Sequence, residues 1–473
     1  MLFNSTEFLF FFPIVTALFF ILPAKVRWIL LLAASCFFYM FFKPEYILIL
    51  AFTIIIDYFA GILIENTVGK SEKRKFLILS LLANIGVLAF FKYYNFINGN
   101  LTSLGQVLGF TNKIPYLSMI LPIGLSFHTF QAMSYTIEVY RGNQKAEKHF
   151  GIYSLYVMFY PQLVAGPIER PQNMLPQFHA KQTFQVDQIA NGLNLIVYGF
   201  FKKLVVADRL SVYVNNVYGD IDNANSISML IAVCFFSIQI YCDFSGYSDI
   251  ARGTAKCMGF DLMVNFERPY LAQSISEFWR RWHISLSTWF KDYLYIPLGG
   301  NRVKRPKAYR NLFIVFLVSG LWHGANWTYI IWGGLHGIYV ILESMTHRIR
   351  NRLNILLRIN RARTFHTFLN RMAVFILVTF AWIFFRAPGV DQAFKVMQKI
   401  VSFDFSRNLT IISAQKGPLN LFLSFGVIVI LGCSYLLPKN LQMKNSALFI
   451  AFTTFIIILA GKDVGAEFIY FQF

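Results

Sequence analysis

The chain has 473 residues, of which 56% are hydrophobic and only 14% are charged, and it carries a formal net charge of +20. Soluble domains usually carry about 25% charged residues, so this chain has too little polar material to cover a water-exposed surface of its size. The composition excludes a soluble protein and predicts a polytopic membrane protein. The positive charge does not indicate nucleic-acid binding, because Lys and Arg gather between apolar runs, as in the cytoplasmic loops of membrane proteins.

The cysteines and the N-terminal residues narrow the class further. No two cysteines form a CxxC pair, so neither a zinc site nor a disulfide framework is indicated. Residues 1–24 are apolar but lack a basic start and a small-residue cleavage signature. We therefore expect a retained first membrane span and not a removed signal peptide.

Runs of about 20 apolar residues are long enough to cross a membrane as helices. The first five such runs lie at residues 7–23, 26–42, 46–64, 76–94 and 114–140. Basic residues follow the first, third and fifth runs, whereas the loops between the others are nearly uncharged. This distribution of Lys and Arg predicts an N-terminus outside the cytoplasm and three basic loops inside it.

The next two apolar segments depart from a simple span. Residues 151–171 are short and are interrupted by prolines and a glycine, so we expect a re-entrant or interfacial segment whose irregular backbone is covered by protein. Residues 189–207 predict a membrane helix with Lys202 and Lys203 inside it. We expect these two lysines to snorkel to an interface in preference to binding a substrate.

The run at residues 226–247 predicts another span with polar side chains inside it. Gln239 and Asp243 are four residues apart, so they lie on one face of the helix. Ionisable residues inside a membrane usually face a cavity or a partner. Asp243 is therefore either a functional group or a carboxylate at the helix end in the headgroup region, and the pattern favours neither.

Residues 252–310 are polar and basic, which predicts a cytoplasmic or interfacial position. Within them, the stretch SEFWRRWHISLSTWFKDYLYI (276–296) predicts an amphipathic helix lying in the interface with its aromatic side chains at headgroup level. The aromatic residues that recur at helical spacing are Phe278, Trp282, Trp289 and Tyr293. His283 falls in the same stretch, where a lone histidine is more often structural than catalytic.

An apolar hairpin or kinked pair of helices is predicted at residues 311–344, and it contains His323. Twelve helical residues from Asn311 would place His323 about 18 Å into the ~30 Å core. A buried histidine is held neutral and can take a proton from a hydroxyl. The alternative is a histidine hydrogen-bonded between helices, but the flanking Trp322 and the small Gly320 and Gly324 favour catalysis, because small residues permit close packing or a helix break.

The other histidines and the C-terminal part complete this description. His336 in the hairpin and His128 in the fifth run could line the same cavity as His323, and we expect His336 to be structural. Further spans are predicted at 373–385, 419–437 and 446–460, and the charge count places the tail, residues 461–473, outside. No cluster has metal-ligand spacing, so no metal is expected.

Four motifs in this order carry a resemblance that spans nearly the whole chain. They are YPQLVAGPIER (160–170), YCDFSGYSDIARG (241–253), WRRWHISLSTWFKDYLYIPLGGNR (279–302) and GLWHGANWTYIIWGGLHG (320–337). Together they resemble the membrane-bound O-acyltransferase (MBOAT) family, in its bacterial branch that includes the membrane subunit for alginate O-acetylation.

The resemblance implies an all-α polytopic membrane fold of about 11 or 12 transmembrane helices, with re-entrant and interfacial helices, around a central tunnel. The chain would be one membrane domain, with N-terminal spans (1–150), a catalytic core (151–345), and C-terminal spans and tail (346–473). His323 would be the principal catalytic residue and His283 a second histidine facing the tunnel. We add candidates for lining the tunnel or binding the donor: Trp322, Trp282, Arg280, Arg281, Ser287, Asp243, Gln239, His128 and His336.

The same resemblance implies a function. The chain would move an acyl group, most simply acetyl, from acetyl-CoA or an acyl-carrier thioester in the cytoplasm across the bacterial inner membrane. The acceptor would be an exported cell-surface polysaccharide, reached through an extracytoplasmic O-acetyltransferase or similar envelope protein. D-alanyl transfer to a cell-wall polymer stays open, and a transporter or flippase is the alternative from another class, since broken helices and intramembrane polar residues also suit transport.

The tail ends in EFIYFQF (467–473). This resembles the C-terminal aromatic–Tyr–aromatic motif of a small partner protein in teichoic-acid D-alanylation. Tyr470 would then accept the acyl group and present it to the extracytoplasmic transferase. The alternative is an interfacial aromatic anchor, which Phe and Tyr commonly provide at a membrane edge.

Overall fold

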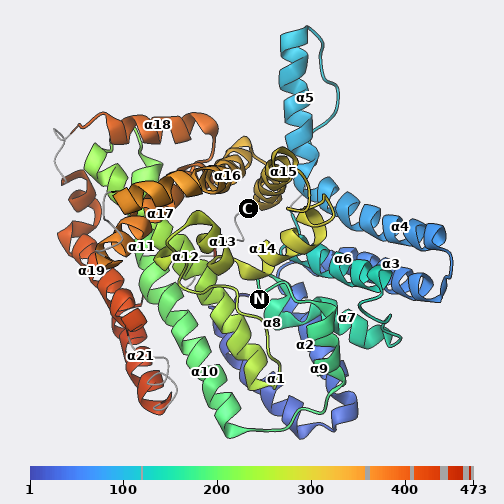
Figure 1. Cartoon of the computed structure of the whole chain (residues 1–473). Coiled ribbons are helices and arrows are strands. Elements are labelled where there is room, and N and C mark those ends of the chain that lie inside the picture. The colour runs from blue at the N-terminus through green and yellow to red at the C-terminus, as the bar shows by residue number, and fades with distance from the viewer. Residues whose placement is uncertain (119–120, 357–362, 405–409, 437–445, 462–467, 470–473) are drawn as a thin grey trace. The chain divides into compact units, whose positions relative to one another are not determined.

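The computed structural model describes the chain except for residues 119–120, 357–362, 405–409, 437–445, 462–467 and 470–473 (Figure 1). The described residues are mainly helical, and no strand occurs among them. By their internal contacts they form two compact units. Unit 1 comprises residues 1–196 and 249–263, and unit 2 comprises residues 197–248 and 264–473.

Unit 1 contains the N-terminal helices. In chain order they are α1 (Thr6–Ile21), α2 (Arg27–Met40), α3 (Ile47–Asn66), α4 (Lys70–Leu88), α5 (Tyr94–Leu108), α6 (Leu125–Arg141), α7 (Phe150–Met158), α8 (Tyr160–Leu163), α9 (Pro171–His179) and α10 (Val186–Phe200), whose last turn belongs to unit 2. A π-helical turn at Ala89–Tyr93 joins α4 to α5 without a break.

Helices α3, α4 and α6 pack side by side in unit 1 (Figure 1). Asp57 of α3 is fully buried between them and accepts hydrogen bonds from Ser80 Oγ (2.6 Å) and Asn84 Nδ2 (2.8 Å). A carboxyl group without partners would be costly in this apolar setting. The two donors on α4 therefore fix the register between α3 and α4.

The predicted fifth span at 114–140 is wrong in its first half. The helix, α6, begins only at Leu125, after Gly124 in the left-handed region (φ 79°). Residues 114–117 lie along α5, where Asn95 Nδ2 donates to Leu117 O (2.7 Å) and Asn98 Nδ2 donates to Ile114 O (3.1 Å). These asparagine side chains satisfy backbone groups that a helix would otherwise satisfy internally, so apolar composition alone overstated the helix.

The interrupted helix predicted at 151–171 is confirmed. Helix α7 ends at Met158, α8 is a single turn, and residues 164–170 are not helical. Nearly every residue of the stretch is buried in unit 1, which meets the requirement that irregular backbone be covered by protein. Its place relative to the membrane stays a prediction.

Unit 2 contains the motif-bearing helices. In chain order these are the π-helical turn η4 (Phe201–Ala207), α11 (Asp208–Gly219), most of α12 (Ser226–Cys257), α13 (Ile275–Arg281), α14 (Ile284–Phe290), the π-helical turn η6 (Lys291–Tyr295), α15 (Arg305–His323), α16 (Trp327–Leu356), α17 (Arg363–Arg386), α18 (Val390–Val401), α19 (Thr410–Leu436) and α21 (Ser446–Ala460).

An aromatic core holds α13, α16 and α17 together. Trp282, at the end of α13, lies with its ring centroid 5.1 Å from that of Trp382 on α17. Trp382 also stacks on Trp332 of α16 at 5.6 Å, and all three side chains are at most 1% exposed. Each buried tryptophan removes a large apolar area from solvent. This core fixes α13, which leads into the RRWH stretch, and α16, which follows the WHG stretch.

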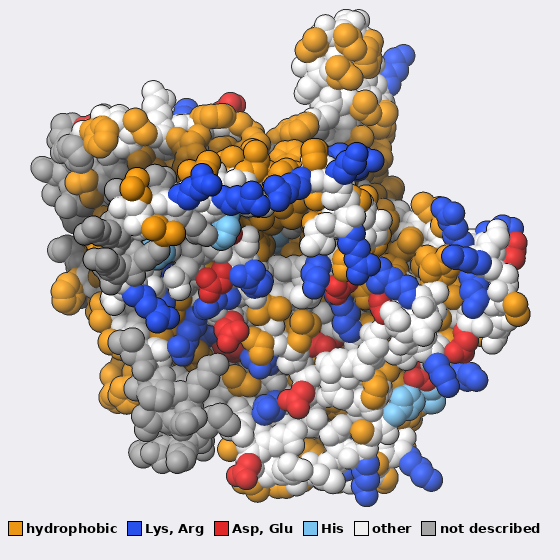
Figure 2. Space-filling model, viewed as in Figure 1, with side chains coloured by type: hydrophobic (Ala, Val, Ile, Leu, Met, Phe, Trp, Pro, Cys, Tyr) orange, Lys and Arg blue, Asp and Glu red, His pale blue; other side chains and the backbone are white. Residues whose placement is uncertain are grey.

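Five of the described helical segments are long and apolar enough to cross a membrane: Pro44–Asn66, Lys70–Leu108, Val186–Gly219, Ser226–Cys257 and Arg363–Arg386. Shorter apolar helices lie at Thr6–Ile21, Leu421–Tyr435 and Ile450–Leu459. Large hydrophobic side chains are exposed on many of them, and the space-filling view shows such side chains beside Lys and Arg (Figure 2). The all-α, polytopic membrane fold is thereby confirmed, while the division of the domain along the sequence stays a prediction.

Three further predicted helices differ in extent from the structure. The helix predicted at 189–207 continues through η4 and α11 to Gly219, and the span predicted at 226–247 continues to Cys257. The single amphipathic helix predicted at 276–296 is wrong. It breaks at Trp282–His283, and its aromatic side chains Phe278, Trp282 and Trp289 are buried within the protein.

Candidate functional site

His323 is the last residue of α15, at the turn into α16. The two helices form a close hairpin, as predicted (Figure 1). Glycine permits this approach, because a Cβ on Gly320 would meet the backbone carbonyl oxygen of Tyr329 and lie 3.3 Å from the Cα of Gly333. The hairpin therefore sets His323 at a helix end, where the side chain leaves the regular helix surface.

The side chain of His323 is 4% exposed and is surrounded by aromatic rings. Its ring centroid lies 4.8 Å from Trp322, 4.9 Å from Trp332 and 5.4 Å from Phe385 of α17. Low polarity around an imidazole disfavours its protonated form. The surroundings therefore suit a neutral base.

His283 sits at the break between α13 and α14 in a left-handed conformation, φ 43° and ψ 55°. Residues other than glycine pay roughly 1–2 kcal/mol for this region. The side chain and backbone of Asn265 hold the break in place: its carbonyl oxygen accepts the N–H of Ile284 (2.9 Å), and its Oδ1 accepts the hydroxyl of Ser285 (2.9 Å). Strained backbone of this kind tends to occur at functional sites.

The break brings His283 to His323, with ring centroids 6.4 Å apart. His283 is fully buried, and its ring also packs edge-on against Phe244 of α12 at 4.6 Å. Burial lowers the pKa of His283 to about 3, so this imidazole is neutral across the physiological range. The two histidines, which come from different motifs, share one buried aromatic site in unit 2.

His336 lies near this pair, with Trp332 between it and His323. It is fully buried on α16, its ring centroid is 5.1 Å from that of Trp332, and its Nδ1 accepts the indole N–H of Trp279 (3.3 Å). Trp332 in turn contacts His323. The structure thus connects His336 to His323 through a tryptophan ring.

The remaining candidates of the RRWHISLS motif surround the break. Arg280 is exposed, and Arg281 forms an ion pair with Glu277 one turn earlier. The hydroxyl of Ser287 donates to the carbonyl oxygen of Trp282 (3.2 Å). Of these side chains, only the Arg280 guanidinium is well placed for contact with a polar molecule outside the fold.

The prediction that Lys202 and Lys203 snorkel is wrong. Both are buried, and Lys203 Nζ lies 2.7 Å from Asp243 Oδ1 and 2.9 Å from Asp208 Oδ1. The oppositely charged neighbours on α11 and α12 hold the amine inside the protein, where the sequence offered no sign of a partner. Asp243 is consequently inside unit 2 near the middle of α12, and Gln239, one turn earlier, is buried as well.

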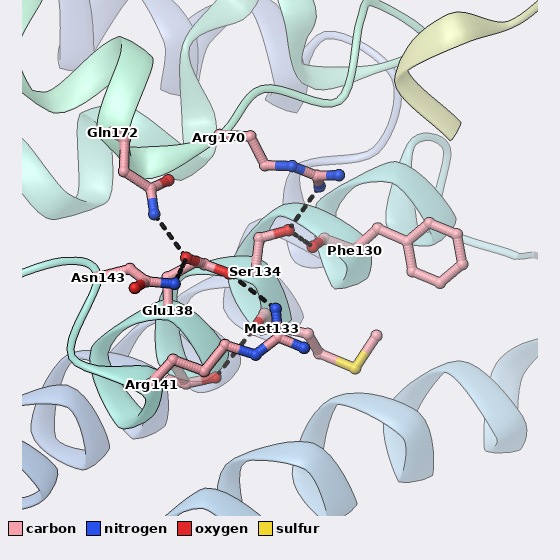
Figure 3. A network of polar contacts seen from close by, with 9 residues as sticks. Phe130, Met133, Ser134, Glu138, Arg141, Asn143, Arg170 and Gln172 are labelled. Carbon is pink, nitrogen blue, oxygen red and sulfur yellow. Dashed lines mark hydrogen bonds and ion pairs between the residues drawn. The ribbon is translucent and has the colours of Figure 1, made fainter. Parts of the chain in front are cut away.

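His128 belongs to unit 1, on α6, and its Nε2 is 2.6 Å from Thr53 Oγ1 of α3. Further along α6, Glu138 receives hydrogen bonds from Asn143 (2.9 Å) and Gln172 (2.7 Å) and pairs with Arg141 (3.2 Å) (Figure 3). Arg170, at the end of the YPQLVAGPIER motif, donates to Ser134 of the same helix. This motif is therefore fixed to α6 by polar contacts.

Residues that the sequence did not single out complete the site. Trp332 contacts both His323 and His336, Phe385 packs on His323, and Asn265 holds the His283 break. Trp332 lies within the motif GLWHGANWTYIIWGGLHG (320–337) and could have been picked out there. Phe385 and Asn265 lie outside the four motifs, and no spacing rule connects them to the histidines.

The structure does not test the predictions about Tyr470 and about a metal. Tyr470 lies outside the described residues. Among the residues that the structure does describe, no group of three or more His, Cys, Asp or Glu side chains could hold a metal ion.

A comparison with known protein families finds a match over the part of the chain that contains the site. Residues 88–386 match the model of MBOAT, the membrane-bound O-acyltransferase family. The matched range includes both histidines, the aromatic residues around them and the Lys203–Asp243 pair.

Among curated relatives, the chain is 38% identical over 407 residues to the probable alginate O-acetylase AlgI of Pseudomonas aeruginosa, covering 85% of this chain and 75% of the relative. It is 36% identical over 442 residues to the peptidoglycan O-acetyltransferase of Helicobacter pylori, covering 85% and 80%. A more distant relative is the teichoic acid D-alanyltransferase of Bacillus subtilis, 28% identical over 233 residues and covering 47% of this chain and 59% of the relative.

Proposed function

We propose a specific role for this chain on the premise that it belongs to the membrane-bound O-acyltransferase family. It is an O-acyltransferase embedded in a membrane. The role is O-acetylation of an exported cell-surface polysaccharide, with His323 as the catalytic base. The observation that carries the proposal is the meeting of His323 and His283 in one buried aromatic site.

In the proposed reaction, the imidazole of His323 takes the proton from an acceptor hydroxyl. The hydroxyl oxygen then attacks the carbonyl carbon of the acyl thioester, an ester C–O bond forms, and the C–S bond breaks. The thiol leaves with a proton returned by His323. A neutral imidazole in an apolar site is suited to this transfer, because general base catalysis requires an unprotonated nitrogen at neutral pH.

His283 has a different proposed role. Its side chain is neutral and buried, and its backbone is held by Asn265. A neutral imidazole can donate one hydrogen bond from its N–H to an oxygen on which negative charge develops. We assign it the orientation or polarisation of the thioester carbonyl, with His323 acting on the hydroxyl.

The proposed donor is acetyl-CoA or an acyl-carrier thioester, bound from the cytoplasmic side. Both are anionic, and basic residues concentrate in the loops that the charge distribution assigns to the cytoplasm. Arg280, which is exposed beside the His283 break, is a described basic side chain that can meet such a donor. The same charge count supports an N-terminus outside, and the bacterial relatives support an inner-membrane location.

The proposed acceptor is a polysaccharide outside the cytoplasm. The names of the relatives cover alginate, peptidoglycan and, more distantly, teichoic acid. Acetyl transfer is favoured over D-alanyl transfer because the two acetyltransferases match 85% of this chain and the D-alanyltransferase only 47%. The partner would be an extracytoplasmic O-acetyltransferase, to which Tyr470 would present the acyl group as a phenyl ester.

The test of the catalytic proposal is the O-acetyl content of the cell-surface polysaccharide in cells producing the wild type or His323→Ala at matched membrane levels. We expect His323→Ala to lower it by a factor of about 100 or more with the yield of polymer intact. The exposed histidine variant His179→Ala serves as the control and should behave as the wild type. Unchanged acetylation in His323→Ala would rule out this residue as the base, and loss of the polymer itself would favour a transporter.

The relay through Tyr470 is tested separately. Tyr470→Phe removes only the hydroxyl that would carry the acyl group. Loss of polysaccharide acetylation with normal protein level supports the relay. Full acetylation by Tyr470→Phe assigns the tail tyrosine to an interfacial anchor and leaves the role of His323 unaffected.

A further inference from the structure

Two residues of the tail are buried inside unit 2. Phe468 is 1% exposed and Ile469 is 6% exposed. An aromatic anchor at a membrane edge would expose its side chains to the headgroup region. These two residues instead pack among side chains of η4 and α12, so this part of the tail is held by protein.

The contact to α12 is both polar and aromatic. The backbone N–H of Ile469 donates to Asp243 Oδ2 at 2.8 Å. The ring of Phe468 meets Tyr247 edge-on at a centroid distance of 4.9 Å. Asp243 and Tyr247 are four residues apart and therefore lie on one face of α12, so one helix face contacts two successive tail residues.

Lys203 completes the contact from the other side. Its Nζ lies 4.3 Å from the centroid of the Phe468 ring, a cation–π distance. The same amine pairs with Asp243 Oδ1 at 2.7 Å. The two oxygens of Asp243 thus have separate partners: one binds Lys203, and the other accepts the tail N–H. Lys203 thereby fixes the orientation of the carboxylate toward the tail.

The contact lies next to the histidine site. Phe244 follows Asp243 on α12, and its ring packs against His283 at 4.6 Å. Helix α12 therefore presents the tail contact on one face and a wall of the histidine site on the adjacent face. A buried ion pair inside a membrane protein is costly and is a functional hypothesis by default, and no step of the acyl transfer described above uses this one.

We propose that the Lys203–Asp243 pair is a docking site for the tail, and that Asp243 is a positioning residue for acyl transfer. Asp243 holds the backbone at Ile469, the residue that precedes Tyr470 in the sequence, and Lys203 and Tyr247 hold the Phe468 ring. The inference rests on the proposed acyltransferase function and deepens it. The site would recognise a peptide segment of this chain, through the N–H of Ile469 and the aromatic ring of Phe468. It would not bind a lipid or a soluble ligand.

The hydrogen bond itself can be followed by hydrogen–deuterium exchange of the full-length protein in detergent. We expect the amide signal of the peptide containing Phe468 and Ile469 to exchange at least about tenfold faster in Asp243→Ala than in the wild type. Asp243→Asn keeps an oxygen that can accept the N–H, so its exchange should stay close to the wild type. Equal protection in Asp243→Ala and the wild type would overturn the docking site.

A second pair of variants leaves the buried ion pair untouched. Ile469→Pro removes the backbone N–H that donates to Asp243, whereas Ile469→Ala keeps it and trims the side chain. We expect Ile469→Pro to lower kcat for transfer from radiolabelled acetyl-CoA to the polysaccharide by at least about tenfold, with the KM for acetyl-CoA unchanged. Ile469→Ala should retain transfer. Equal activity of the two variants would overturn the positioning role.

His323→Ala, measured by both methods, separates this inference from the function on which it rests. If the docking site is right, His323→Ala keeps the tail amides protected while transfer is lost. If His323→Ala transfers normally, the catalytic proposal fails whatever the exchange data show. If Ile469→Pro exposes the tail and transfer continues at the wild-type rate, the acyltransferase stands and Asp243 is not a positioning residue.

Discussion

His283 and His323 lie with ring centroids 6.4 Å apart although they come from different motifs and different helices. His323 reaches this position because α15 ends at it, and His283 because the chain breaks into a left-handed turn between α13 and α14. In both cases the histidine stands where a helix stops. A side chain at such a point is less constrained by the regular helix surface, which suits a group that must meet a substrate.

His283→Asn separates the chemistry of His283 from its backbone role. Asn is among the residues that tolerate the left-handed region, so we expect the thermal unfolding temperature to stay close to that of the wild type. The imidazole N–H is lost, and we expect acyl transfer to fall by a factor of about 100, as when one oxyanion donor is removed. Thermal stability and transfer from labelled acetyl-CoA are measured on the same purified protein.

His283→Val is the matched comparison, because a β-branched residue is strongly disfavoured at positive φ. It should lose both stability and activity, in contrast to His283→Asn. If His283→Asn were as active as the wild type, the imidazole would have no part in the reaction and His283 would be a structural residue.

The sequence predicted the class of fold and the two central histidines, but not the way they meet. Apolar runs and basic loops are local signals, so the helical membrane architecture could be predicted from them. The left-handed turn at His283 depends on Asn265, which lies in another segment, and no local pattern reports such a contact. The single amphipathic helix predicted there failed for this reason.

The buried lysine shows a second limit of sequence reasoning. Lys203 has the pattern of a snorkelling residue, and only the fold shows that Asp208 and Asp243 face it. The apolar stretch before α6 shows a third limit. Hydropathy cannot distinguish a helix from an extended segment whose backbone is hydrogen-bonded by asparagines on α5. In each case tertiary partners that the local sequence does not report overturned the prediction.

Lys203→Met should strongly destabilise the protein. The substitution leaves two carboxylates, Asp208 and Asp243, buried without their cation, and removing one partner of a buried ion pair typically costs about 3–5 kcal/mol. The side chains concerned are 1–6% exposed. The measurement is the midpoint of thermal unfolding in detergent at matched concentration.

Lys395→Met is the control for this variant within the same unit. Its pair with Asp222 is largely exposed, with side-chain exposures of 56% and 77%, and such pairs are worth about 0–1 kcal/mol. A similar loss of stability in the two variants would show that burial does not set the contribution of the Lys203 pair.

Gly320→Ala should disturb the α15–α16 hairpin and, through it, His323. The added methyl group would meet the carbonyl oxygen of Tyr329, which is backbone and cannot rotate away. Overpacking of this kind typically costs about 1–3 kcal/mol, and we expect transfer activity to fall as well. In Gly426→Ala on α19, no atom of the described residues beyond its own stretch of helix would lie within 4 Å of the new Cβ, so this variant should be neutral or slightly stabilising. If the two variants were equally stable and active, close approach at Gly320 would not matter to the site.

Glu169 should make the folding stability of unit 1 depend on pH in a predictable direction. Its carboxyl group is buried and accepts hydrogen bonds from the N–H of Met263 and from Asn173 Nδ2 (2.7 Å). Burial raises its pKa above the ordinary value of 4.5, although these hydrogen bonds and the charges of Arg170 and Arg252 act in the opposite direction. The folded state therefore binds this proton more tightly than the unfolded state. The corresponding stability is fully present below pH 4.5 and is lost as the pH rises through the folded-state pKa.

Glu169→Gln removes this titration while keeping a side chain of the same shape. As the pH rises from 4.5, the wild type should therefore lose this stability and Glu169→Gln should not. The unfolding temperature of Glu169→Gln should rise relative to that of the wild type. Thermal unfolding in detergent over a series of buffers measures the difference. A difference for Glu169→Gln that moved the other way would mean that the hydrogen bonds and the two arginines outweigh burial at this carboxyl group.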